Sequence, residues 1–171
     1  MLMRWLPVAA VVGFCSLLWW PVVRPHAPKL IYNLSPSAPI GWYRIDPKSR
    51  AERGDLVAAY AADWARDMGD ERDYLPRDLP LIKTVWAVEG DEICYKSGSV
   101  AASRRPTLAV PGVDGAGRSL PALEGCQTLG EDEVFLVSIQ TDASWDSRYF
   151  GAVKRSEVLG RAVYLGKGWD R

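Results

Sequence analysis

Residues 5–23, WLPVAAVVGFCSLLWWPVV, restrict the folding of this chain more than any other stretch, because they carry no charged side chain. An α-helix rises about 1.5 Å per residue, so a helix of this length crosses most of a ~30 Å hydrocarbon layer. Trp19 and Trp20 lie near the end of the stretch, where an interfacial aromatic belt would lie. The sequence therefore predicts a membrane anchor at residues 1–24 and a separate domain at residues 25–171.

The charges beside this stretch do not give its orientation, since Arg4 precedes it and Arg24, His26 and Lys29 follow it. A cleaved signal peptide is the alternative interpretation. Its apolar core should be shorter and should end in small residues before an A-x-A-like cleavage site. This core ends in WWPVVRP, so we expect a retained transmembrane helix.

The chain as a whole suits one globular domain, with 171 residues of which 48% are hydrophobic. Lys and Arg number 21, and so do Asp and Glu. The formal net charge is zero, so there is no basic field of the kind that indicates nucleic acid as a partner.

Short β-rich runs separated by Gly, Pro and Asp predict a mainly β domain. We expect strands at residues 41–45, 55–60, 80–88, 91–95, 133–139 and 158–166. The polar, acidic run at 61–75 is the best candidate for a short helix, and the Gly- and Pro-rich run at 110–125 is a loop excursion. Neither run has the character of a domain boundary.

Three cysteines give information on the compartment. Cys15 lies in the apolar stretch, which leaves Cys94 and Cys126 as a pair in the rest of the chain. A disulfide between them would close a loop of about 33 residues and stabilise the fold by about 3–4 kcal/mol, but only in an oxidising compartment such as a periplasm. Two unrelated buried thiols are the alternative. If the pair is bonded, the domain lies outside the cytoplasm.

The chain has only one histidine, His26, and this excludes the catalytic and metal sites that need two or more histidines. The chain cannot build a zinc site from two histidines or from four cysteines, and it has no glycine-rich phosphate loop, so we expect no metal and no cofactor. A Ser-His-Asp triad would have to use a histidine next to the membrane segment. If the protein is a hydrolase, its general base is therefore expected to be another residue.

Lys83 is the alternative base, because it lies within an apolar strand pattern on the face shared by Leu81 and Val85. The competing interpretation is snorkelling, in which the methylene stem packs and the ammonium reaches water. An ordinary lysine pKa near 10.4 handicaps a general base by about 4–5 kcal/mol at neutral pH. Burial can lower a lysine pKa by about 3–5 units and so bring the amine into the range needed to deprotonate a serine.

Three boxes follow the apolar stretch in order: NLSPSAPIGWYRI (33–45), LIKTVWAVEGDEI (81–93) and SWDSRYFG (144–151). With them the chain resembles the type I signal (leader) peptidases, over about residues 33–166. The resemblance implies a signal-peptidase-like antiparallel β-sheet domain preceded by one N-terminal transmembrane helix.

The serine box departs from that of general signal peptidases, which usually have Met after the nucleophile. Ala38 follows Ser37 in this chain. The box is more similar to that of the conjugative-transfer signal peptidases of TraF type, whose members mature the pilin of type IV secretion systems, in some cases by joining the cut pilin into a ring.

The resemblance implies a role for three residues at the reaction centre. Ser37 matches the family's nucleophile and Lys83 matches its general base. Ser35 matches the position whose hydroxyl, with the backbone N–H of the nucleophile, holds the oxyanion. A loop-capping serine is the alternative for Ser35.

The last box contributes supporting residues. Ser144 matches the serine that hydrogen-bonds the lysine amine, which would aim Nζ at Ser37. Asp146 and Arg148 are expected to form an ion pair below the site. Structural roles alone would fit these three residues almost as well.

The serine box also predicts a stiff loop. Pro36 and Pro39 limit the backbone around Ser37, and Gly41 permits a conformation or a close approach that a Cβ would forbid. Asn33 is expected to bond to the loop backbone or to form an Asx turn.

Together these expectations describe a membrane-anchored serine endopeptidase that processes a propilin-type precursor for conjugation. We expect it at the bacterial inner membrane with its domain facing the periplasm, and with the lipid bilayer and a membrane-tethered pilin precursor or preprotein as partners. A general signal peptidase and a non-catalytic assembly factor remain as alternatives. Soluble Ser-Lys autoproteases of DNA-damage repressors use related chemistry but lack the membrane segment.

Overall fold

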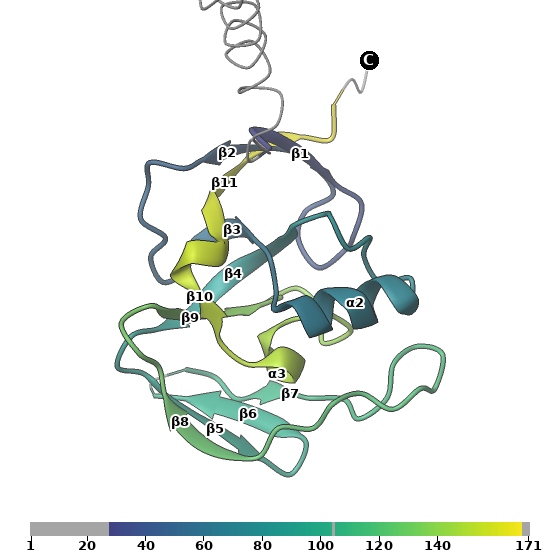
Figure 1. The fold of residues 1–171 in the computed structure, drawn as a ribbon, viewed down its shortest axis with the longest axis vertical. Coiled ribbons are helices and arrows are strands. Elements are labelled where there is room, and N and C mark those ends of the chain that lie inside the picture. The colour runs from purple at the N-terminus through teal and green to yellow at the C-terminus, as the bar shows by residue number, and fades with distance from the viewer. Residues whose placement is uncertain (1–27, 104, 169–171) are drawn as a thin grey trace, which may run out of the picture.

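Two antiparallel β-sheets and two short α-helices make up the part of the chain that the computed structural model describes, residues 28–103 and 105–168 (Figure 1). The elements in chain order are β1 (Leu30–Asn33), β2 (Gly41–Asp46), β3 (Leu56–Ala59), α2 (Asp63–Glu71), β4 (Leu81–Val88), β5 (Glu92–Lys96), β6 (Ser99–Ala102), β7 (Leu108–Ala109), β8 (Gly125–Thr128), β9 (Glu133–Val137), α3 (Ser147–Phe150), β10 (Val153–Lys154), the 3-10 turn η2 (Arg155–Glu157) and β11 (Val158–Gly166).

The larger sheet has seven strands in the order β1-β2-β11-β3-β4-β9-β10. Strand β2 shows the expected alternation, since Tyr43 and Ile45 are buried while Trp42 and Arg44, the residues that precede them, are exposed. Strand β11 pairs with both β2 and β3, so the two halves of the chain are joined at this strand. The serine box (33–45) therefore contributes strands to the same sheet as the box that contains Lys83 (81–93).

Strand β4 is the central strand of the core, and seven of its eight residues are buried. It pairs with β3 through residues 81–84 and with β9 from Thr84 onward. Both faces of the strand are covered, which explains its nearly continuous apolar sequence. Lys83 is thus placed inside the protein by the strand that carries it.

Trp145 anchors helix α2 to the rest of the domain. Its indole Nε1–H donates to the carbonyl of Ala65 at 3.0 Å, and Gly69 lets the helix lie close to the same ring. Tyr149 stacks on Trp145, with ring centroids 5.6 Å apart. These contacts fix the end of α2 and the turn after it beside the sheet.

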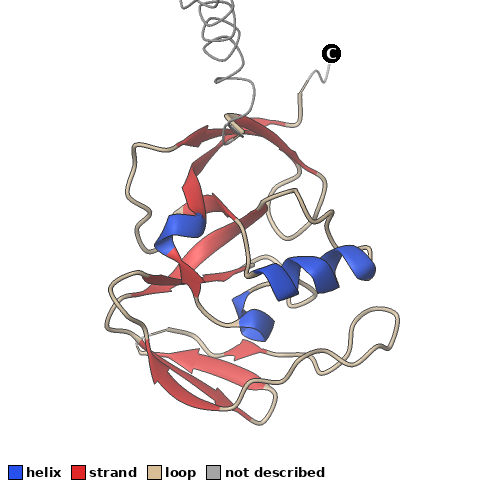
Figure 2. Ribbon diagram, in the orientation of Figure 1, coloured by secondary structure: helices blue, strands red, loops and turns tan. Residues whose placement is uncertain are grey.

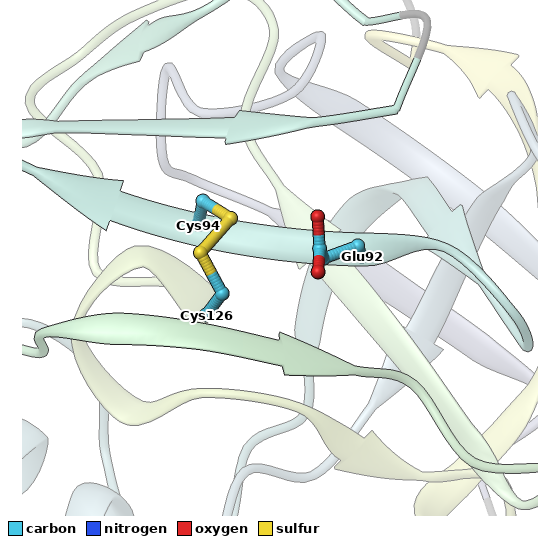
Figure 3. Close-up of side chains that lie close together, drawn as sticks. All are labelled: Glu92, Cys94 and Cys126. Atoms are coloured by element: carbon cyan, nitrogen blue, oxygen red, sulfur yellow. A yellow bond between two sulfur atoms is a disulfide. The ribbon is translucent and has the colours of Figure 1, made fainter.

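The smaller sheet has four strands in the order β7-β6-β5-β8 and lies at the far end of the domain from β1 (Figure 1). A disulfide joins Cys94 on β5 to Cys126 on β8, which are direct partners in the antiparallel register. Glu92 lies beside it (Figure 3). Because both sulfurs are in the S–S bond, neither offers a thiolate to a metal ion.

The six predicted strands are all present, and that at residues 158–166 has the predicted bounds. The predicted helix at 61–75 is shorter, because α2 ends at Glu71. Most of the chain between β7 and β8 is loop, as Figure 2 shows and as the Gly and Pro content predicted. The sequence did not predict β1, β6, β7, β8, β10 or α3, which are each four residues or fewer.

The predicted membrane helix at residues 5–23 lies outside the described residues. Within residues 28–103 and 105–168, no helix has both the length and the apolar content needed to cross a membrane.

Replacing both Cys94 and Cys126 with Ala should lower the free energy of unfolding by about 3–4 kcal/mol, because the bond closes a loop with a sequence separation of 32 residues. Urea denaturation of the full chain in detergent measures the change. Cys15→Ala is the matched control, since it removes a cysteine and leaves the disulfide intact. A loss below about 1 kcal/mol in the double variant would show that the disulfide does little to hold the fold.

Candidate active site

Ser37 and Lys83 meet in the interior of the domain. Ser37 lies on the loop between β1 and β2, and Lys83 is the third residue of β4. The Lys83 ammonium Nζ donates to Ser37 Oγ at 2.7 Å. Ser37 is 5% exposed and Lys83 is 4% exposed. The snorkelling interpretation of Lys83 is therefore wrong, because its amine ends on a buried hydroxyl.

Burial lowers the pKa of Lys83 from 10.5 to about 8. The Asp146 carboxylate raises this pKa in part, and the Arg148 guanidinium lowers it. With a pKa of about 8, the cost of the neutral amine at pH 7 falls to about 1.4 kcal/mol. The geometry and the charge state both allow proton transfer between Ser37 and Lys83.

Asn33 fixes the loop that carries Ser37. Its side-chain amide donates to the carbonyls of Ser35, Ala38 and Pro39, at 2.8, 3.0 and 3.2 Å. Its Oδ1 accepts from the Ser35 N–H at 3.2 Å. The hydroxyl of Tyr43 donates to the same Pro39 carbonyl at 2.7 Å. The Asn33 side chain therefore hydrogen-bonds to the loop backbone, as the sequence predicted.

Gly41 and Ser138 make two further contacts that position the loop between β1 and β2. Gly41 has a φ of +145°, and a Cβ there would clash with the carbonyl of Gly166, so the predicted close approach is present. Ser138 Oγ donates to the Ser37 carbonyl at 2.8 Å. Ser37 is thus held through its own backbone by a residue that follows β9 and lies 101 positions later in the chain.

Ser35 lies within hydrogen-bond distance of two atoms of Ser37. Its Oγ accepts from the Ser37 N–H at 3.3 Å, and its hydroxyl donates to Ser37 Oγ at 3.0 Å. The Ser37 N–H and the Ser35 hydroxyl, which the resemblance implies as oxyanion donors, therefore lie next to each other. Here the N–H donates to Ser35 Oγ and the hydroxyl donates to Ser37 Oγ, so both donors would have to turn toward a substrate carbonyl.

Ser144 does not make the predicted hydrogen bond to the Lys83 amine. Its Oγ is buried and has no hydrogen-bond partner among the described residues. Both residues line one cavity. The prediction of a direct bond was wrong because the hydroxyl lies at the cavity wall, whereas Nζ is turned toward Ser37.

Asp146 and Arg148 form the predicted ion pair, and both side chains are fully buried. Arg148 Nε donates to Oδ1 and Nη2 to Oδ2 of the carboxylate, each at 2.9 Å. Asp146 also accepts from the backbone N–H of Arg148 at the start of α3 and from that of Ser138. The pair therefore connects α3 to the residue that holds the Ser37 carbonyl.

A cavity of about 310 Å³ opens beside Ser37 and Lys83. Its wall is formed by the loop between β1 and β2 that carries Ser37 (the serine loop), the turn after α2, the start of β4, the loops at 111–120 and 142–145, and α3. The lining residues are Asn33, Ser35, Ser37, Tyr74, Leu75, Pro80, Leu81, Ile82, Lys83, Pro111, Val113, Asp114, Gly115, Leu120, Asp142, Ala143, Ser144, Trp145 and Tyr149. Most of this surface is apolar, which suits the side chains of an extended peptide.

Sequence reasoning missed Ser138 and the loop that contributes Pro111 to Leu120. Ser138 follows an apolar strand, and a hydroxyl at the end of such a strand is a weak signal that only the fold makes specific. The loop gave no signal beyond its Gly and Pro content, because its partners lie about forty residues earlier in the chain.

The profile of the signal peptidase family, peptidase S26, matches residues 2–166. The chain therefore belongs to the signal peptidase family S26, as the resemblance predicted.

Its relatives within the family include proteins of plasmid transfer. The plasmid transfer protein TraF of Escherichia coli is 38% identical over 74% of this chain and 77% of its own length. The probable conjugal transfer protein TraF of Sinorhizobium fredii is 35% identical over 90% of this chain and 81% of its own. The conjugal transfer protein TraF of Agrobacterium tumefaciens is 37% identical over 76% and 78%.

Among solved structures, a signal peptidase I from Enterococcus faecalis V583 is 19% identical, with a TM-score of 0.39. The alignment covers 69% of this chain and 98% of that one.

Replacing Asp146 with Asn should destabilise the fold by about 3–5 kcal/mol, because it leaves the buried Arg148 guanidinium without its counter-charge. The free energy of unfolding in urea checks this. Lys154→Gln removes an exposed ion pair with Glu133 and should cost less than about 1 kcal/mol. Equal, small losses in both variants would contradict a supporting role for the buried pair.

Proposed function

We propose that this protein is a membrane-anchored serine endopeptidase that processes a propilin-type precursor for conjugative transfer, with Ser37 as nucleophile and Lys83 as general base. The observation that carries the proposal is the 2.7 Å contact between the buried Lys83 amine and the Ser37 hydroxyl. Membership of the S26 family and relatives named for plasmid transfer support the reaction class and the process.

In the first step the neutral Lys83 amine takes the proton of Ser37 Oγ, and Oγ attacks the carbonyl carbon of the scissile peptide bond. The Ser37 N–H and the Ser35 hydroxyl turn to the developing oxyanion. Lys83 then gives its proton to the leaving amine as the C–N bond breaks. An ester between the precursor and Ser37 remains.

In the second step a nucleophile attacks this ester with Lys83 again as base, and the proton returns to Ser37 Oγ. Water as the nucleophile gives a trimmed, linear product. The amino terminus of the same pilin chain as the nucleophile gives a cyclic product, because an amide forms in place of the ester. Both products regenerate the same enzyme.

In the described part of the chain, strand β4 offers an unpaired backbone edge beside this site, where an extended substrate could bind. Residues 81–83 of β4 pair with β3, and no described strand pairs with their other edge, since β9 begins its pairing at Thr84. A peptide added along this edge would run past Lys83 and place its side chains in the cavity.

Two features support a place at the periplasmic face of the bacterial inner membrane. The disulfide between Cys94 and Cys126 suits an oxidising compartment. Large apolar side chains are exposed on β1, β2, the serine loop and the end of β11, close to where the described chain begins: Leu30, Tyr32, Leu34, Ile40, Trp42, Tyr164 and Leu165. Such a patch suits contact with a lipid bilayer that also tethers the precursor.

Processing should be lost in Ser37→Ala and Lys83→Ala, each by at least about 10³-fold, because one removes the nucleophile and the other the base. The protein is co-expressed with pilin precursors encoded nearby, and intact masses of the products are taken. A cyclic product would be one water lighter than the linear trimmed chain.

The matched controls are Ser156→Ala and Lys96→Ala, which change the same residue types at exposed positions and should process normally. A secretory preprotein supplied as a second substrate distinguishes a general signal peptidase, which would cut it as readily. Full processing by Ser37→Ala would instead support a non-catalytic assembly factor, and processing that survives Lys83→Ala would remove the lysine from the mechanism.

The acylation rate should rise with pH and level off above about 8, the pKa to which burial lowers Lys83. Only the neutral amine accepts a proton, and at pH 7 about a tenth of the molecules hold it. Single-turnover cleavage between about pH 6 and pH 9 measures this profile. A rate that is flat or falls across this range would contradict the assignment of Lys83 as base.

A further inference from the structure

The loop at residues 111–120, which we name the flap, forms one wall of the cavity that contains Ser37 and Lys83. The chain is fixed before and after it. The Val110 N–H donates to the Gly98 carbonyl, and Arg148 Nη1 donates to the Ala109 carbonyl. On the other side, β8 carries the disulfide through Cys126.

Polar contacts fasten the flap to the turn after α2. The Tyr74 hydroxyl donates to Asp114 Oδ2 at 2.5 Å, and Arg118 Nε donates to the same oxygen at 2.7 Å. Arg118 Nη2 donates to the Arg72 carbonyl, and Arg72 Nη1 donates to the Ser119 carbonyl. We name the group of Tyr74, Asp114 and Arg118 the latch.

Asp114 is the centre of the latch. Its Oδ1 also accepts the backbone N–H groups of Ala116 and Arg118, so the carboxylate shapes the flap as well as fastening it. The hydrogen bond from Tyr74 is the main cause that holds the pKa of Asp114 well below its usual range. The Asp114 carboxylate is therefore charged at neutral pH.

Apolar packing does not hold the flap. Of the described residues, none in 111–120 belongs to the three buried clusters of the core. Val113 lines the cavity and is 54% exposed. A segment with few buried apolar contacts opens at low free energy, so the polar latch decides whether this wall is in place.

We propose that the flap is a specificity element: the latch of Tyr74, Asp114 and Arg118 holds it against the turn after α2, and the closed flap limits the size of the substrate side chain that the cavity admits. The inference rests on the proposed function, because it assigns the cavity to a peptide substrate. Pro111, Val113 and Leu120 are the apolar side chains that the flap brings to the cavity wall.

The first experiment measures the latch without reference to activity. Tyr74→Phe keeps the ring that packs against Trp145 and removes only the hydroxyl that bonds Asp114. Hydrogen exchange of the full chain in detergent should become about tenfold faster in residues 111–120, including the Leu120 amide that bonds Gly112. Tyr60→Phe is the matched control, because it also removes a single tyrosine hydroxyl, but this one donates to the Asp78 carbonyl and belongs to a residue outside the cavity lining. Unchanged exchange in Tyr74→Phe would overturn the latch.

The second experiment measures specificity with two precursor peptides that differ only in Ala or Leu before the cut. In Tyr74→Phe and Asp114→Asn the ratio of kcat/KM for Leu to that for Ala should rise by about tenfold. Tyr60→Phe should leave the ratio as in the wild type. An equal fall for both peptides would show a merely structural loop and overturn the inference.

Failure of the proposed function gives a different result. If the wild type cuts neither peptide, the proposed function fails, and the Kd values of the two intact peptides replace kcat/KM. The same rise in the ratio for Leu is then expected in the latch variants. An unchanged binding ratio would overturn the flap as a specificity element.

Discussion

The ion pair of Asp146 and Arg148 is the interaction on which the site depends, because it joins segments that no single sheet holds together. Arg148 reaches the carbonyls of Ala109 and Thr141 as well as its carboxylate partner. Asp146 begins α3 and accepts the N–H of Ser138, whose hydroxyl holds the Ser37 carbonyl. Two buried charges thus position the serine loop, the smaller sheet and the cavity wall. Removing either charge would leave the other buried without a counter-charge, so the site needs both residues.

The same pair explains how a lysine can be buried nearby and still lose its proton at moderate pH. A lone carboxylate beside Lys83 would hold the proton on the amine and raise its pKa. Asp146 does act in this direction, but Arg148 acts against it, and burial is the largest effect. The pair therefore supports the site without fixing the charge of Lys83, and desolvation is the main influence on the pKa of that amine.

Strand patterns predicted most of the larger sheet, since each predicted strand has either alternation or a continuous apolar run. Strands such as β7 and β10 have two residues each, and no periodicity can indicate them. Lys83 was predicted because the single histidine, His26, lies beside the apolar stretch, and its partner Ser37 was predicted from the resemblance that the three boxes carry. Ser138 and the latch could not be predicted, because they depend on which loops the sheet brings together.

The sequence did not reveal why Ala follows Ser37. Ala38 is 1% exposed and packs in a buried cluster with Tyr43 and Ile82, which belong to β2 and β4. Because Ala38 is almost fully buried, a Met in this place would add side-chain volume inside the packed cluster, at a cost of about 1–3 kcal/mol. The small residue is therefore part of how the serine loop rests on the sheet that carries the lysine.

Hydrogen bonds hold both sides of the cavity, but they are made by different groups on the two sides. For the proposed protease, this difference would keep the Ser37–Lys83 geometry fixed while the cavity admits a peptide chain. The serine side is tied by carbonyl contacts from Asn33, Tyr43 and Ser138, two of which reach it from the sheet. The flap side is tied by hydrogen bonds of surface side chains. In the proposed reaction, a rigid serine loop would keep Ser37 within reach of Lys83 through each cycle, while a wall without core packing would yield to an entering peptide. Reversing this arrangement would fix the cavity wall and loosen the distance between Ser37 and Lys83 on which the proposed proton transfer depends.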